Sequence, residues 1–143
     1  MITIEKTAEL PADADRIWSV VSDLGRWQDW LTIHQKWKSD VPAQLGQGTK
    51  VTGVASVLNM PNTIEWVVDE WDAPRKLAIS GKGLAGAVVT ISLAVTPQGD
   101  GSELVVTSSF DGQMIVGAIA GAIERASKKE LDTSLANLEK LVA

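Results

Sequence analysis

The sequence has 143 residues and no cysteine, and its 18 acidic and 13 basic side chains give a formal net charge of −5. This length suits one domain over residues 1–143, and the missing cysteines exclude disulfides and thiolate metal sites and fit a reducing cytoplasm. The negative charge disfavours nucleic acid as a partner. The longest strongly apolar run, 114–123, is shorter than the about 20 residues that cross a membrane, so we expect a soluble cytoplasmic protein without membrane insertion.

The N-terminal third predicts one strand and two short helices. The first ten residues alternate between apolar and polar side chains, which indicates a half-buried strand that ends at Pro11. Asp13 is a good helix N-cap, and the apolar spacing after it predicts an amphipathic helix over 13–22. Asp23 can cap a second short helix over 24–31, and Gly25 marks a tight bend between the two.

The middle of the chain has the pattern of strands and turns. Short strands are predicted at 35–40, 49–58, 63–71 and 77–80, separated by turns rich in Gly, Pro, Asn and Asp. Two clearer strands follow at 89–96 and 104–111, where every second residue is apolar and is expected to face inward. The segment 50–58 has apolar residues at both parities, so its inner face stays open.

The C-terminal part predicts a long helix that opens at Asp111 or Gly112. Apolar residues at three- and four-residue spacing run from Val116 through Ile119 and Ile123 to Val142. A helix of about 28 residues, roughly 42 Å long, is the only predicted element that can cover a seven-stranded antiparallel meander. The sequence therefore predicts an α+β fold of order β-α-α-β6-α, with a curved seven-stranded sheet around the C-terminal helix.

Three segments also carry a family resemblance. They are Pro11 to Trp18 with the later Arg26-Trp27-Gln28-Asp29-Trp30, the strand end Glu70-Trp-Asp72-Ala-Pro74-Arg75, and the leucines 131, 135 and 138. The whole chain resembles the START-related lipid-transfer and polyketide-cyclase superfamily (SRPBCC), in particular its short bacterial polyketide cyclase/dehydrase-like branch. The resemblance implies the helix-grip fold and a cavity for a hydrophobic molecule, such as a polyketide-like aromatic, a quinone or a lipid. It leaves open a cyclase/aromatase enzyme and a protein-interaction or chaperone co-factor module.

The long helix begins with small residues between Gly117 and Ala122, which either allow close helix–sheet contact or leave volume for a ligand. Six tryptophans, four of them between residues 18 and 37, form either core or a ligand wall. From strand parity and helix position, the predicted ligand-binding residues are Trp30, His34 and Trp37 near the mouth, and Trp66, Val68, Leu93, Phe110, Ile115, Ala118, Ile119 and Ala122 inside.

Two residues are candidates for acid–base chemistry. His34 is the only histidine, and its ordinary pKa suits proton transfer near neutral pH, although a strand-edge histidine in solvent is the simpler interpretation. Glu70 shares the inward parity of Trp66 if the strand is regular, whereas a bulge would turn it outward, towards Arg75. One histidine without cysteine predicts no metal site, and no cofactor is expected. The few ionisable residues at inward positions favour binding over catalysis.

Overall fold

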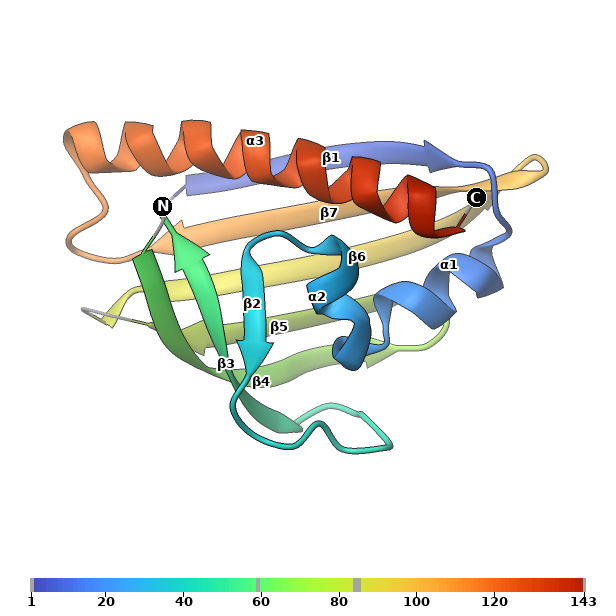
Figure 1. Ribbon diagram of the computed structural model, residues 1–143, viewed down its shortest axis with the longest axis horizontal. Helices are drawn as coiled ribbons and strands as arrows, with labels where there is room; N and C mark the ends of the chain where they lie inside the picture. Colours follow the sequence, from blue (N-terminus) through green and yellow to red (C-terminus); the bar gives the residue numbers. More distant parts are fainter. Residues whose placement is uncertain (1, 59, 84–85, 143) are drawn as a thin grey trace.

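The computed structural model describes residues 2–58, 60–83 and 86–142, so Met1 of the predicted first strand lies outside the described residues. The elements follow the predicted order of one strand, short helical segments, six strands and a long helix (Figure 1). They are β1 (Ile2–Leu10), α1 (Ala14–Val21), the 3-10 helix η1 (Leu24–Arg26), α2 (Trp27–Trp30), β2 (His34–Trp37), β3 (Lys50–Val57), β4 (Met60–Asp72), β5 (Lys76–Lys82), β6 (Val88–Gln98), β7 (Gly101–Asp111) and α3 (Gly117–Val142).

All seven strands form one antiparallel sheet in the order β1-β7-β6-β5-β4-β3-β2. Strands β2 to β7 pair in sequence, as a meander does, and β1 pairs with β7 from Ile2 opposite Phe110 to Leu10 opposite Ser102. The sheet curves, and α3 lies along its concave side next to β1 (Figure 1). This is the predicted α+β helix-grip arrangement.

Strand parity decides which side chains face α3. On β6, Val89, Ile91, Leu93 and Val95 are all buried, while their neighbours in sequence are partly exposed. On β7 the inward residues run from Leu104 to Phe110, and Ser108 stands among them opposite Ile91. The predicted inward faces of both strands are confirmed.

The pairing of β3 with β4 settles the inner face that the sequence left open. Val51 lies opposite Trp66, and Gly53 lies opposite Ile64. Because directly paired residues share one face of a sheet, the odd-numbered residues of β3 face the concave side. Gly53 is required there, since a Cβ at this position would lie 2.8 Å from the Trp37 ring.

The long helix starts later than predicted. Residues up to Asp111 continue β7, and α3 begins only at Gly117, whose φ of +60° favours glycine. The buried stripe runs from Ile123 to Val142 and includes Ser127 and Ser134. Val116 and Ile119, expected in this stripe, are 65% and 48% exposed: Val116 precedes the helix, and Ile119 lies before its first buried residue, Ile123. No helix in the described part of the chain is long and apolar enough to span a membrane.

The short helices after β1 are held by their predicted caps. The Asp13 carboxylate accepts a hydrogen bond from the Arg16 amide at 2.9 Å, and that of Asp23 accepts one from the Gly25 amide at 3.1 Å. The second predicted helix is split into η1 and α2, and Trp27 anchors it by donating from its indole to the Val21 carbonyl at 2.9 Å. The chain is thereby bent so that α2 lies against α3.

Candidate functional site

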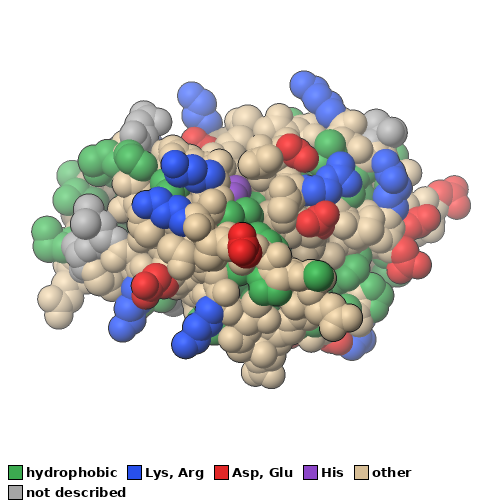
Figure 2. Space-filling view, turned by 60° about the horizontal axis from the view of Figure 1, so that its bottom comes forward, with side chains coloured by type: hydrophobic (Ala, Val, Ile, Leu, Met, Phe, Trp, Pro, Cys, Tyr) green, Lys and Arg blue, Asp and Glu red, His purple; other side chains and the backbone are tan. Residues whose placement is uncertain are grey.

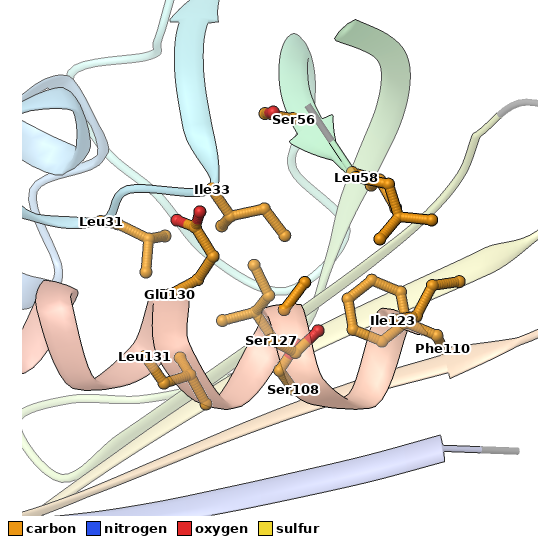
Figure 3. Close-up of a pocket in the computed structure, with 13 residues that line it drawn as sticks. Leu31, Ile33, Ser56, Leu58, Ser108, Phe110, Ile123, Ser127, Glu130 and Leu131 are labelled. Atoms are coloured by element: carbon orange, nitrogen blue, oxygen red, sulfur yellow. The ribbon is translucent and has the colours of Figure 1, made fainter. Parts of the chain in front are cut away.

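A first cavity of about 180 Å³ lies between the middle of α3 and the concave side of the sheet (Figure 3). Its walls are formed by residues 31 and 33 after α2, by 56–58 at the end of β3, by Ile91, Ser108 and Phe110 of the sheet, and by five residues of α3 between Ile123 and Leu131. Most of these side chains are apolar. The space therefore suits the apolar part of a small molecule.

A second cavity of about 190 Å³ adjoins the first towards the start of α3. Four residues line both cavities, namely Val57, Leu58, Phe110 and Ile123. The second cavity is bounded in addition by the start of β4, by the loop after β7 and by Ile119 of α3. Together the two spaces form a hollow that follows α3 from its middle to its N-terminal end.

The end of this hollow is rimmed by exposed apolar side chains. Among the described residues, the exposed large apolar side chains are Leu58, Met60, Met114, Val116 and Ile119, and all but Val116 line the second cavity. Figure 2 shows hydrophobic side chains at the left end of the molecule, where Figure 1 places the start of α3, the end of β3 and the start of β4. We call these five residues the apolar rim; exposed apolar groups in one place are typical of a binding or entry site.

Two buried serines interrupt the apolar wall of the first cavity. Ser108 on β7 is 4% exposed and Ser127 on α3 is 9% exposed, and both line the cavity. No hydrogen bond joins either hydroxyl to another side chain or backbone group within the described residues. Both hydroxyl oxygens are open to the cavity, so they are available to water or to a polar group of a ligand.

Glu130 is the one ionisable side chain that the described residues contribute to either cavity. It rises from α3 beside Leu31 and Ile33 (Figure 3), and its carboxylate accepts a hydrogen bond from the Thr32 hydroxyl. The Thr32 amide donates to the Ser134 hydroxyl at 2.9 Å, and that hydroxyl donates to the Glu130 carbonyl at 2.8 Å. These bonds tie the segment after α2 to α3 and hold a negative charge at one end of the hollow.

The structure does not bring His34 to the cavities. His34 is 8% exposed and packs between Trp27 and Trp37, with its ring centroid 4.3 Å from that of Trp37. Burial lowers the pKa of His34 to about 4, so the imidazole is neutral at pH 7. Its Nε2 atom has no hydrogen-bond partner within the described residues. His34 therefore lies in an aromatic cluster rather than at the mouth.

The predicted tryptophans and two of the predicted core residues lie away from the two cavities as well. Trp30 is 1% exposed, and the Trp37 indole donates to the Leu24 carbonyl at 2.7 Å. Trp66, Val68 and Leu93 face the concave side as expected, but they are packed in the core. Ala118 is exposed and Ala122 half-buried on α3, and neither borders a cavity. Of the predicted inner residues, Phe110, Ile115 and Ile119 line the hollow.

Glu70 is turned away from the interior by a bulge in β4. The pairing with β5 shifts between Val68 and Glu70, which breaks the inward parity. The carboxylate lies in solvent and pairs with Lys76 at 3.4 Å, while Arg75 pairs with Asp72 at 2.8 Å. Glu70 is therefore an exposed ion-pair partner that does not line either cavity.

Sequence reasoning missed the polar residues of the first cavity. Ser108 and Ser127 each occupy a position in an otherwise apolar inward pattern, one with period two and one with period 3.6. A serine at such a position is the available signal, because the pattern places it inside while its chemistry requires a partner. Glu130 gave no such signal, since it reads as part of a charged helix face.

The fold and the hollow define a helix-grip protein of the SRPBCC type, and comparison with known proteins agrees. The profile of the family described as "Polyketide cyclase / dehydrase and lipid transport" matches residues 1–143, and the chain belongs to this family. It is 34% identical over 141 residues to "Uncharacterized protein Rv1546" of Mycobacterium tuberculosis H37Rv, covering 99% of each chain. It is 29% identical to "Toxin Rv0910" of the same organism, covering 100% of this chain and 99% of that one.

A solved structure has the same fold. The START superfamily protein from Mycobacterium smegmatis superposes with a TM-score of 0.77 at 19% identity, covering 98% of this chain and 96% of that chain. At this identity the likeness concerns the fold alone. Family and fold together indicate a domain of the kind that binds hydrophobic ligands.

Proposed function

We propose that the protein binds a hydrophobic small molecule, such as a polyketide-like aromatic, a quinone or a lipid, in the hollow between α3 and the sheet. The observation that carries this proposal is the open apolar hollow itself. An apolar molecule that covers the walls of this hollow removes apolar surface from water, which is favourable by roughly 25 cal/mol per Å². A hollow of this kind is therefore expected to be used, as ligand sites are.

The apolar rim supports the same function. Met60, Met114 and Ile119 are each about half exposed or more and border the second cavity. A hydrophobic molecule that leaves water can first contact these side chains and then move along α3 past Phe110. Among the described lining residues only Glu130 can ionise, which favours a binding role over proton-transfer chemistry.

Titration with Nile red, a neutral dye that fluoresces in apolar surroundings, tests the proposal. The wild-type protein should give a saturable rise in fluorescence. The substitution Ala126→Phe introduces a ring at a half-buried position of α3 that lines the first cavity, so it should weaken dye binding at least tenfold. Ala136→Phe is the matched control, because Ala136 is exposed on the same helix and outside both cavities.

Circular dichroism establishes that both variants are folded before the dye is added. Equal dye affinity of Ala126→Phe and Ala136→Phe would place the bound dye elsewhere on the surface. A wild-type protein that gives no saturable signal with Nile red, and none with a panel of quinones and aromatic polyketides, would contradict the proposed function.

A second candidate is an activity that inhibits cell growth, and one observation favours it. The relative named a toxin is 29% identical to this chain over its whole length. The apolar rim would then contact a protein partner instead of admitting a ligand. Induced expression in a bacterial host should stop colony formation if this candidate holds, and a variant with Met60→Ser and Ile119→Ser should restore it; normal growth would refute it.

A further inference from the structure

The chemistry of the wall restricts which hydrophobic molecules can enter, given the proposed binding function. Glu130 brings a negative charge to the first cavity, and no Lys, Arg or His lines either cavity among the described residues. A carboxylate that leaves water needs a positive partner or several hydrogen-bond donors. The hollow therefore lacks the cation that a fatty acid or another organic anion requires.

The same wall offers partners for a neutral polar group. The hydroxyls of Ser108 and Ser127 can each donate and accept, and no hydrogen bond within the described residues uses either one. Both hydroxyls are open to the cavity, although the two residues are only 4% and 9% exposed. Ser127 and Glu130 are three residues apart on α3, so they lie on one side of the helix (Figure 3). The Oε2 atom of Glu130 accepts a hydrogen bond from the Thr32 hydroxyl, whereas the Oε1 atom of Glu130 has no hydrogen-bond partner in the described part of the chain.

We propose that the hollow selects uncharged apolar molecules that carry a hydroxyl group and rejects organic anions. The ligand hydroxyl donates to Glu130 and exchanges a hydrogen bond with Ser127 or Ser108. The apolar body of the ligand extends past Phe110 towards the rim at Met60 and Ile119. Alcohols and phenols fit this description, whereas fatty acids do not.

The size of the discrimination follows from the charge. Two carboxylates about 5 Å apart at an effective dielectric constant of about 20 repel each other by an amount that corresponds to roughly three hundredfold in affinity. Solvent at the open end of the hollow screens part of this repulsion. We therefore expect a phenol to bind at least tenfold more tightly than the carboxylate of the same ring system.

Three compounds with the same aromatic body test the proposal at pH 7 by displacing Nile red. These are 2-naphthol, which is neutral and carries a hydroxyl, 2-naphthoate, which is anionic, and 2-methylnaphthalene, which is neutral and apolar. The wild-type protein should bind 2-naphthol at least tenfold more tightly than 2-naphthoate. The wild-type measurement needs no substitution, so it holds even if a variant fails to fold.

Variants then assign the selectivity to residues. Glu130→Gln keeps a hydrogen-bond acceptor for Thr32 but removes the charge, so it should reduce the preference for 2-naphthol over 2-naphthoate at least fivefold. Glu139→Gln is the matched control on an exposed position of the same helix and should leave the preference unchanged. The double variant Ser108→Ala and Ser127→Ala should lower the affinity for 2-naphthol about tenfold. Its affinity for 2-methylnaphthalene should equal or exceed that of the wild type.

The outcomes separate this inference from the proposed function. Displacement of Nile red with equal affinity for 2-naphthol and 2-naphthoate would leave the hydrophobic site in place and overturn the selectivity. An unchanged preference in Glu130→Gln would overturn the assignment to that carboxylate. Failure of the folded wild-type protein to bind Nile red or any of the three compounds would overturn both.

Discussion

Acidification should destabilise the protein through its only histidine. His34 is buried beside Trp27 and Trp37, and burial lowers its pKa from 6.5 to about 4. Between pH 6.5 and pH 4 the histidine is therefore protonated in the unfolded chain but mostly neutral in the folded protein. As a result, the free energy of unfolding falls as the pH falls from 6.5 towards 4. The neutral imidazole contributes its full stabilisation above pH 6.5.

The size of the effect can be worked out from the shift. The difference between these two pKa values lowers the free energy of unfolding by about 3 kcal/mol once the pH is below both. Between pH 7.5 and pH 5 the loss is about 2 kcal/mol. His34 lies on β2, one of the two edge strands of the sheet, where water offsets part of the desolvation. We therefore expect a loss of roughly 1 kcal/mol over this interval.

Urea denaturation followed by tryptophan fluorescence at pH 7.5, 6 and 5 measures this loss. The comparison is with His34→Phe, which keeps a ring in the aromatic cluster and does not titrate. All other titrating groups are shared, so the difference in free energy of unfolding between the two proteins isolates His34. The variant should gain about 1 kcal/mol relative to the wild type as the pH falls from 7.5 to 5. A difference that stays constant with pH would refute the reasoning.

Three further predictions concern the framework that holds the hollow, and denaturant unfolding measures each. Gly81→Ala should lower the free energy of unfolding by more than about 2 kcal/mol, because the new Cβ would meet the Ile64 side chain and the Glu65 backbone. Gly46→Ala, with open space around it, should lower it by about 0.5 kcal/mol or less, and equal losses in the two variants would contradict this. Leu138→Ala, fully buried on α3, should cost about 2–5 kcal/mol, and a loss below 1 kcal/mol would contradict tight packing there. Asp13→Ala should lower the free energy of unfolding by about 1 kcal/mol, because the N-cap of α1 is lost. An unchanged free energy of unfolding would show that Asp13 does not stabilise the helix.

The position of the hollow shows where sequence reasoning stopped. The small residues between Gly117 and Ala122 allow either close helix–sheet contact or space for a ligand, and Ala118 and Ala122 are predicted to line that space. The second cavity does reach this part of α3 at Ile119, but Ala118 and Ala122 border neither cavity, and the first cavity lies further along, beside Ile123 to Leu131. The volume depends on how far the curved sheet stands from α3, and that distance is set by packing between segments far apart in the chain. The side chains of one segment do not contain this information.

The catalytic candidates show the same limit. For Glu70 the sequence leaves two directions open, inward in a regular strand or outward at a bulge; the structure has the bulge, and the carboxylate pairs with Lys76 and not with Arg75. His34 was expected near the mouth, but the bend at η1 and α2 folds the aromatic residues around it. Conversely, the sequence pattern places Glu130 on a solvent-exposed helix face, whereas in the structure it accepts a hydrogen bond from Thr32 and lines the first cavity.

The sequence by itself determined the order of the elements, the antiparallel meander, the helix caps and the inward faces of β6 and β7. These features follow from residue periodicity, turn residues and side-chain hydrogen bonds over a few positions. Only the tertiary structure decided where α3 starts, which face of β3 is inside, and that Ser108, Ser127 and Glu130 meet in one cavity. These features depend on contacts across up to about a hundred residues of chain, such as that from Thr32 to Ser134, which the register and curvature of the whole sheet bring together.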